Sequence, residues 1–456
     1  MIGRLILGAS IISRRQLHVI SRSETYIKPA SPTPLNLKKY DLSYHDRMFP
    51  NLYISMILFY SNPQQLPSKT TMPNLLKNSL SKALSKYYPF AGRLRSAGSY
   101  VDCNDQGVQF YEARIACTLS EILKRAAAKE EQEGFGHLFP PGSVWANANV
   151  SDSCLVVVQL NHFSCGGIAI AVNFTHRTVD GSTLLSFLNY WASLSRNPSD
   201  EENLVHLHPH YVYELLPQSC NENVIATQAS FPQKHWITME VVFPNSKIAQ
   251  LKANQERQDK RDGVVSDQKY TRNELVTALL YRCSVAAATS SNSGVYTNSV
   301  LFQTVDMRSL LDPPMPKTTV GNLFVLNHMP TGTMSEIMIN SMVRQMRKAK
   351  MQLKGIKSMD EIEGVMPLVD KYSKTNHKMY FVSSICKFPF YDVMDFGWGR
   401  HVRATVVDAP FVNCFFMADT PSKDGIQVTV NLEEEDMKSF RADSELLAYA
   451  SFKTES

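Results

Sequence analysis

Residues 168–181, IAIAVNFTHRTVDG, decide how the chain is interpreted. Ile168 to Phe174 form an apolar, partly β-branched run, which predicts a buried strand. Residues 181–194 follow with leucines and a tryptophan at helical spacing, which predicts an amphipathic helix. His176 therefore lies where a buried strand ends and a helix begins. At such a position an imidazole can be fixed beside a cleft.

The segments around this strand–helix unit predict a mixed α/β chain. Residues 154–160 form a second apolar run, joined to the first by an expected turn at residues 165–167. Thr271 and Glu274 have the spacing of a capping box and predict the start of a helix. A charged loop is expected around residues 255–263. The other expected strands cover residues 52–60, 236–243, 378–386, 401–407, 413–418 and 425–432, and the other expected helices cover 72–86, 275–287, 334–353 and 434–450. This order is too irregular for a doubly wound parallel sheet.

At 456 residues the chain exceeds one ordinary compact domain, so two domains are expected. Residues 197–232 are rich in Pro, Asn, Ser and His and form the expected linker. They separate an N-terminal domain, residues 21–196, from a C-terminal domain, residues 233–456. Residues 1–20 are expected to be an extension ahead of the first strand. Because this leader is rich in arginine and no acidic residue precedes Glu24, an organelle transit peptide is the alternative.

Composition narrows the class of protein. The formal net charge of +5 is spread along the chain without long blocks, which does not indicate a nucleic-acid partner. No window approaches about 18 unbroken apolar residues, so we expect no transmembrane helix. None of the eight cysteines lies in a CxxC pair, and several lie in apolar stretches. This pattern favours buried free thiols in a reducing compartment, and hence a cytoplasmic location, over disulfides or a zinc site.

His176 is the strongest candidate for chemistry. Of the twelve histidines, only His176 has an aspartate, Asp180, four positions downstream. A neutral imidazole with a pKa near 7 suits the abstraction of a proton from an alcohol. The alternative is a core histidine whose ring is satisfied by the backbone. For Asp180, which precedes Gly181, the alternatives are a helix N-cap or an ion-pair partner without a chemical role.

Two other motifs have less specific interpretations. In residues 395–399, DFGWG, two glycines flank an indole, which predicts a tight turn where chain or ligand approaches closely. His206, His208 and His210 alternate, so they could share one side of a strand and bind a metal. They lie in the expected linker with a proline among them, which favours solvated loop histidines and no metal site.

The HxxxD of His176 and the DFGWG of Asp395, in this order and about 220 positions apart, resemble the signatures of the plant BAHD acyltransferases. The resemblance extends from about Ser21 onward. It includes four further segments, residues 27–34, 88–94, 305–308 and 320–322. Residues 31–34, SPTP, and residues 101–105, VDCND, are similar to the alkaloid-acetylating members of that family.

The resemblance implies a two-domain fold like that of chloramphenicol acetyltransferase, with a mixed sheet in each domain and a channel between them. His176 would be the general base in that channel. Asp180 would point away from the reaction and pair with Arg308. Four residues of the second motif are expected to support the site: Asp395, Gly397, Trp398 and Gly399. Two departures put contact details in doubt: Asp306 stands where many members have Asn, and Thr319-Val320 stand where aromatic residues are common.

The same resemblance implies an enzyme that is a monomer, has no permanently bound cofactor and takes acyl-CoA, with acetyl-CoA favoured, as co-substrate. The acceptor is expected to be a hydroxyl of a plant specialised metabolite, with an alkaloid favoured. A non-alkaloid alcohol or a sugar is the alternative acceptor, and a non-catalytic metabolite-binding relative is the alternative class. No GxSxG nucleophile elbow is present, so direct transfer without an acyl-enzyme is expected.

Overall fold

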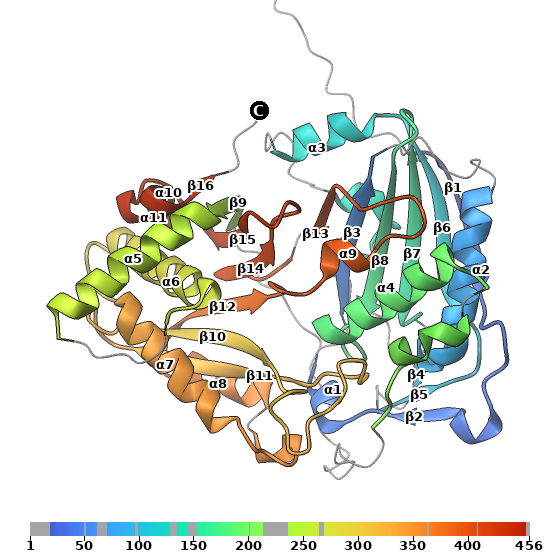
Figure 1. The fold of residues 1–456 in the computed structure, drawn as a ribbon, viewed down its shortest axis with the longest axis horizontal. Coiled ribbons are helices and arrows are strands. Elements are labelled where there is room, and N and C mark those ends of the chain that lie inside the picture. Colours follow the sequence, from blue (N-terminus) through green and yellow to red (C-terminus); the bar gives the residue numbers. More distant parts are fainter. Residues whose placement is uncertain are drawn as a thin grey trace, which may run out of the picture.

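The computed structural model describes residues 19–49, 52–61, 71–95, 99–127, 135–144, 153–199, 201–212, 236–263, 269–362, 364–407 and 409–452. These residues build two large sheets that lie side by side, each with its own helices, and one small sheet (Figure 1). The fold is therefore mixed α/β, as predicted. The expected interpretations of residues 1–18, and of residues 213–232 of the expected linker, fall outside the described residues.

The first sheet has six strands in the order β1-β6-β7-β8-β3-β13. Neighbouring strands are antiparallel except β6 and β7, which are parallel. The strands are β1 (Val19–Ile27), β6 (Val108–Ile115), β7 (Val156–Phe163), β8 (Ile168–Thr175), β3 (Tyr53–Tyr60) and β13 (Arg403–Val406). The strand predicted before His176 is β8, and each of its residues is buried, which explains its continuous apolar run.

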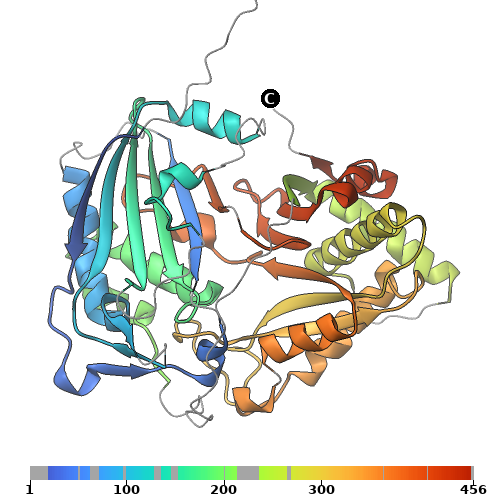
Figure 2. The same ribbon diagram turned by 180° about the vertical axis from the view of Figure 1, so that it is seen from behind.

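Helices cover both faces of this sheet. On one face α2 (Thr71–Lys86) and α4 (Gly181–Arg196) pack against side chains that include Leu58. On the other face, seen from behind in Figure 2, α3 (Leu119–Ala127) and a short 3₁₀ helix (Gly136–Leu138) pack against side chains that include Ile57. Successive residues of β3 thus enter different cores, as the twofold repeat of a strand requires.

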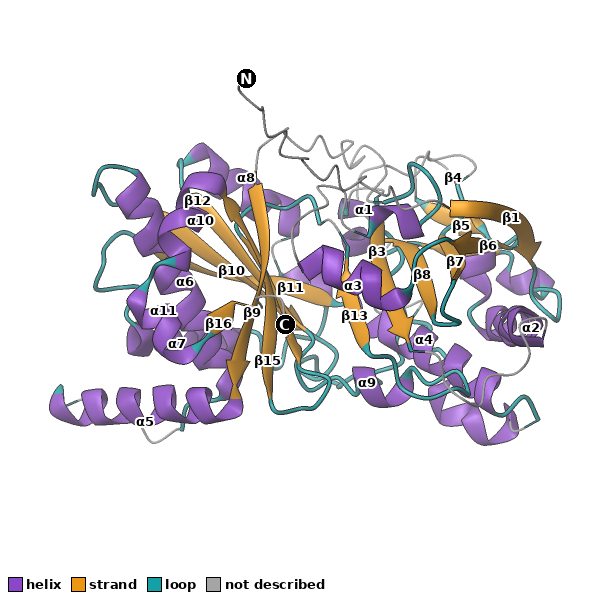
Figure 3. Ribbon diagram, turned by 90° about the horizontal axis from the view of Figure 1, so that it is seen from above, coloured by secondary structure: helices purple, strands orange, loops and turns teal. Residues whose placement is uncertain are grey.

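The second sheet has seven strands in the order β11-β10-β12-β14-β15-β9-β16. They are β11 (Phe324–Thr331), β10 (Ser299–Asp306), β12 (Lys378–Ser384), β14 (Cys414–Asp419), β15 (Gly425–Glu433), β9 (Trp236–Pro244) and β16 (Ser451–Phe452). The helices of this half are α5 (Asn245–Arg261), α6 (Arg272–Ser291), α7 (Ile339–Gln352), α8 (Val365–Lys374), α10 (Glu434–Arg441) and α11 (Ser444–Tyr449). Seen from above, the two sheets and their helices form two adjoining bodies (Figure 3).

Smaller elements lie between or beside the sheets. They are α1 (Tyr44–Met48), α9 (Phe390–Val393), the three-stranded sheet of β2 (Lys39–Asp41), β5 (Tyr100–Asp102) and β4 (Arg93–Arg95), and 3₁₀ turns at Leu35–Leu37, Tyr88–Ala91, Glu201–Leu207 and Met359–Glu361. The chain after β12 returns to the first half, because β13 pairs with β3 there. The domain boundaries predicted from sequence treat the chain as two contiguous halves, whereas residues 390–407 pack on the first sheet and its core.

Several sequence predictions need correction in detail. The charged loop expected around residues 255–263 is largely helix α5, in which the buried apolar residues are Ile248 and Leu251. Because the apolar stripe is so narrow, the segment is mostly polar, and its sequence looks like that of a loop. The closing helix expected over residues 434–450 is two helices, α10 and α11. The capping box of Thr271 and Glu274 is confirmed at the start of α6.

Three further features bear on the class of protein. The described residues contain no helix long and apolar enough to cross a membrane. They also contain no group of three or more His, Cys, Asp or Glu side chains that could hold a metal ion. The seven cysteines within the described ranges are free, and Cys103, Cys154, Cys283 and Cys414 are buried.

Candidate active site

The main chain of His176 is held on both sides where β8 ends. Its N–H donates to the carbonyl of Leu52 at 2.8 Å. Its carbonyl accepts a hydrogen bond from Nδ2 of Asn322 at 2.7 Å. Leu52 precedes β3 in the first half, whereas Asn322 precedes β11 in the second half. The histidine therefore lies at the junction of the two halves.

The ring of His176 is stacked on the ring of Phe49, with centroids 4.6 Å apart and an interplanar angle of 4°. Phe324 tilts against it at 6.0 Å. The residue is partly exposed, but its Nδ1 atom is buried. Burial lowers the pKa of His176, against the opposing effects of its own backbone carbonyl, Asp180 and Asn322. The imidazole is therefore neutral at pH 7 and able to accept a proton.

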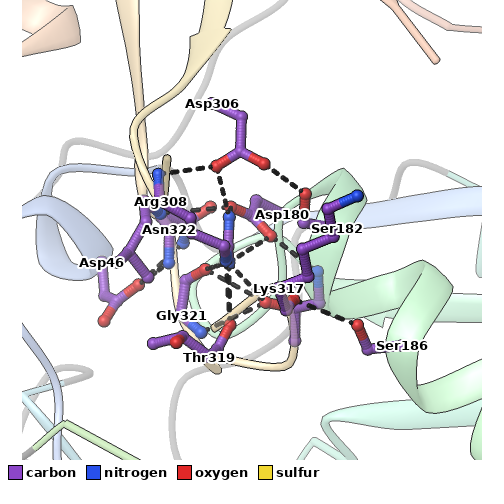
Figure 4. Close-up of polar contacts among 12 residues, drawn as sticks. Asp46, Asp180, Ser182, Ser186, Asp306, Arg308, Lys317, Thr319, Gly321 and Asn322 are labelled. Carbon is purple, nitrogen blue, oxygen red and sulfur yellow. Dashed lines mark hydrogen bonds and ion pairs between the residues drawn. The ribbon is translucent and has the colours of Figure 1, made fainter. Parts of the chain in front are cut away.

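Asp180, the last residue of the HxxxD motif, has a structural role. Its Oδ1 accepts from the backbone N–H of Thr183 at 2.8 Å, which caps helix α4. Arg308 contacts both of its oxygens, and the backbone N–H of Leu323 donates to Oδ2 at 3.1 Å. Both alternatives weighed for Asp180, a helix cap and an ion-pair partner, are thus present together (Figure 4).

Arg308 is 1% exposed and binds partners from both halves. Besides Asp180, it donates to the carbonyls of Thr319 and Gly321 and to Oδ1 of Asp306. Burial lowers the pKa of Arg308, but the attraction of Asp180 and Asp306 outweighs burial and the net shift is upward. At Thr319, one of the positions that depart from the family pattern, the contact is made through the main chain. The aspartate at position 306 adds a second carboxylate to the cluster.

A second buried connection lies beside His176, and sequence reasoning missed it. Asp46, in helix α1, accepts from both the backbone N–H and the Nδ2 of Asn322, at 2.8 and 2.9 Å. Asp46 is 1% exposed, and burial raises its pKa although Ser43 and Asn322 donate to it. The sequence signal was the spacing of Ser43 and Asp46, which form a capping box.

The DFGWG segment forms a turn against the C-terminal end of α4. Oδ1 of Asp395 accepts backbone N–H groups of Gly397, Trp398 and Gly399 at 2.8, 3.1 and 2.9 Å. Both glycines have positive φ, +108° and +98°, which explains why glycine is needed there. Ser195 of α4 donates to the carbonyl of Phe396 at 2.7 Å.

This turn and His176 lie at opposite ends of α4. The helix has 16 residues and is therefore roughly 24 Å long. His176 precedes its first residue, while the aromatic side chains of the turn pack near its end, where Trp191 meets Phe396 at 4.9 Å. The tight turn predicted from the two glycines is confirmed, and its described contacts do not include His176.

The alternate histidines His206, His208 and His210 each make a different contact. His206 contacts the carbonyl of Asn203, and His210 contacts Oγ1 of Thr319. His208 packs edge-on against Tyr190. Part of the segment is a 3₁₀ helix, in which alternate residues do not share a side. The described contacts of these three histidines give no support to the metal-binding interpretation.

Comparisons with known proteins agree with this arrangement. The model of the Transferase family matches residues 17–447. A 17,18-epoxy-17-hydroxycur-19-ene N-malonyltransferase from Strychnos nux-vomica is 36% identical, over 98% of this chain and 93% of the relative. A deacetylvindoline O-acetyltransferase from Catharanthus roseus is 32% identical, over 94% and 97%. The crystal structure of vinorine synthase matches with a TM-score of 0.76 at 26% identity, over 95% and 98%.

The two-sheet fold and these matches define an acyl-CoA-dependent acyltransferase with a fold like that of chloramphenicol acetyltransferase. The chain belongs to the Transferase family, the BAHD acyltransferases, as its motifs indicated. Members of this family use an acyl-CoA as co-substrate, and so does this chain.

Proposed function

We propose that the protein transfers an acetyl group from acetyl-CoA to a hydroxyl of a plant alkaloid, with His176 as general base. The observation that carries the proposal is the protonation state and position of the His176 imidazole. His176 is neutral, partly exposed and fixed at the junction of the two halves, while the neighbouring carboxylate of Asp180 is occupied by Arg308. The imidazole is therefore the basic group of the motif that is available to a substrate.

The reaction then proceeds by direct transfer. Nε2 of His176 takes the proton of the acceptor hydroxyl as its oxygen attacks the thioester carbonyl. The tetrahedral intermediate collapses, the carbon–sulfur bond breaks, and the imidazolium returns the proton to the departing thiolate. The products are the ester and free CoA, and the histidine ends neutral. The seven described cysteines are free, but no covalent acyl-enzyme is required in this route.

Two relatives bear on the choice of substrates, and they differ both in the acyl group and in the acceptor atom. The printed name of the Catharanthus roseus relative specifies O-acetyl transfer, and that of the Strychnos nux-vomica relative specifies N-malonyl transfer. An acetyl donor and a hydroxyl acceptor follow the first, and the resemblance of residues 31–34 and 101–105 to alkaloid-acetylating enzymes supports the same choice. A non-alkaloid alcohol or a sugar is the alternative acceptor.

The test is a crossed assay. Acetyl-, malonyl- and longer aliphatic or aromatic acyl-CoAs are each offered to alkaloid, terpenoid, sugar and simple alcohol acceptors, and the products are identified by mass spectrometry. The highest kcat/KM is expected for acetyl-CoA with an alkaloid alcohol. A preference for malonyl-CoA or for sugars would contradict the proposed substrates. Folded His176→Ala protein is expected to lose transfer, and full activity in it would contradict the assignment of the base.

We also propose that the enzyme acts as a monomer in the cytoplasm without a nucleic-acid partner. The free thiols of the described residues and the modest net charge of +5 support this environment. Size-exclusion chromatography with light scattering and localisation of a C-terminal fluorescent fusion test it. A stable dimer or an organellar signal would contradict it.

A further inference from the structure

Two buried polar atoms, one on the candidate base and one on a residue in contact with it, lack hydrogen-bond partners among the described residues. They are Nδ1 of His176 and Oδ1 of Asn322. Leaving such atoms unpaired costs about 1–3 kcal/mol each, so their occurrence on two residues already in contact calls for an explanation. One of them can donate and the other can accept.

The orientation of the Asn322 amide is fixed by its neighbours. Its Nδ2 lies 2.9 Å from Oδ1 of Asp46 and 2.7 Å from the carbonyl of His176, and both of these atoms can only accept. The NH₂ group must therefore occupy this position, and the amide oxygen must point elsewhere. Asn322 and Asp46 are both buried, at 0% and 1% exposure, so neither exchanges these bonds readily for water.

The neutral imidazole needs a defined proton position. A general base must present its lone pair to the acceptor, and the partly exposed ring can do so at Nε2, because Nδ1 is buried. The proton must then be on Nδ1, where it needs an acceptor. Hydrogen bonds at catalytic groups are often long before substrate binds and tighten in the complex.

We propose that Asn322, held by Asp46, is a positioning residue for His176. Its Nδ2 fixes the main chain of His176, and its Oδ1 accepts the Nδ1 proton, which leaves the lone pair on Nε2. This inference rests on the proposed role of His176 as the base. It is supported by the pKa of His176, which the Asn322 side chain raises against the lowering effect of burial.

The test compares two substitutions with opposite electrostatic effects. Asn322→Ala removes a group that favours the imidazolium, so the acid limb of the kcat profile should move to lower pH. Asn322→Asp adds a negative charge there, so the acid limb should move to higher pH. In both variants kcat should fall roughly 10- to 100-fold while the KM for acyl-CoA changes less than about twofold. If Asn322 only holds the two halves of the molecule together, the acid limb of the kcat profile should stay at the wild-type pH in both variants.

Ser182→Ala is the matched control. Ser182 donates to Asp306 at 2.8 Å across the same junction, but none of its described bonds reaches His176. This variant should keep the wild-type pH profile. Thermal melts establish that each variant is folded. If Asn322→Ala does not fold, Asp46→Asn is used in its place, and kcat is again expected to fall.

Failure of this inference is distinguishable from failure of the proposed function. If both Asn322 variants have the wild-type pH profile of kcat and His176→Ala is inactive, the positioning role of Asn322 is overturned, but His176 remains the general base. Full activity of His176→Ala would overturn the base itself, and the positioning role with it.

Discussion

Arg308 and Asp180 face each other as a bidentate ion pair, with Nη1–Oδ2 at 2.8 Å and Nη2–Oδ1 at 3.0 Å. The two side chains are 2% and 4% exposed. Arg308 follows β10 of the second sheet, and Asp180 caps α4 on the first sheet. One pair of side chains therefore fixes the helix that begins next to His176 relative to the other half of the molecule.

Arg308→Met should destabilise the protein by about 3–5 kcal/mol, because it leaves the carboxylate of Asp180 buried without its partner. Urea unfolding monitored by tryptophan fluorescence measures the change. The double variant Asp180→Asn with Arg308→Met should be less destabilised than Arg308→Met, since no charge is then left unpaired at this position. An unchanged unfolding midpoint in the single variant would contradict this account of the pair.

The pH dependence of the wild-type enzyme should reflect the lowered pKa of His176. The active form is the neutral imidazole, and burial moves its pKa below the usual 6.5. With an acceptor that does not titrate in this range, kcat/KM should therefore stay constant from pH 8 to about 6.5 and decline below it. An acid limb centred above pH 7 would show that the ring is not desolvated.

His401 should make the protein sensitive to mild acid. It is 2% exposed, stacked on Tyr391 at 4.4 Å, and neither ring nitrogen has a hydrogen-bond partner among the described residues. Burial lowers its pKa to about 4. Between pH 6.5 and 4 the unfolded chain binds a proton that the folded protein does not, so stability falls as the pH falls, by up to roughly 3 kcal/mol.

His401→Phe places a phenyl ring, which does not titrate, in the aromatic surroundings of the imidazole. Its melting temperature should be close to that of the wild type at pH 8 and higher at pH 5. The comparison is made by differential scanning calorimetry at both pH values. If the two proteins lose stability equally between pH 8 and 5, other groups account for the acid sensitivity.

Asp395→Ala should destabilise the turn near the end of α4, because three backbone N–H groups lose the same acceptor. A loss of about 1–3 kcal/mol is expected. Asp395→Asn retains an acceptor oxygen and should be milder. Equal melting temperatures for the two variants would indicate that the negative charge, and not the acceptor, matters at this position.

The buried strands with continuous apolar runs were predictable from sequence. The strands expected at residues 154–160 and 168–174 are present at residues 156–163 and 168–175, and both are buried over most of their length and mostly apolar in consequence. Helix α5 was not predicted, since its stripe of apolar side chains is narrow. The strand at 403–406 was expected, but pattern alone could not tell which sheet it would join.

The candidate site was partly predictable for the same reason. His176 and Asp180 belong to one local motif, and the ion pair of Asp180 with Arg308 followed from the family resemblance and is confirmed. The contact between Asp46 and Asn322 joins residues 276 positions apart and has no local signature. Asp46 belongs to a capping box and Asn322 to the segment 320–322 of the family resemblance, but neither pattern predicts the contact between them, so only the folded structure brings their roles together.

The crossing of the chain back to the first sheet limits how the molecule can be divided. β13 is an edge strand of that sheet, and Phe396 and Trp398 belong to its core. A fragment that stops before residue 390 would lack that edge and leave a hole among its aromatic side chains. The two halves are thus neither separable modules nor free to swing apart, and any widening of the space between them to admit a substrate has to leave the β3–β13 pairing intact.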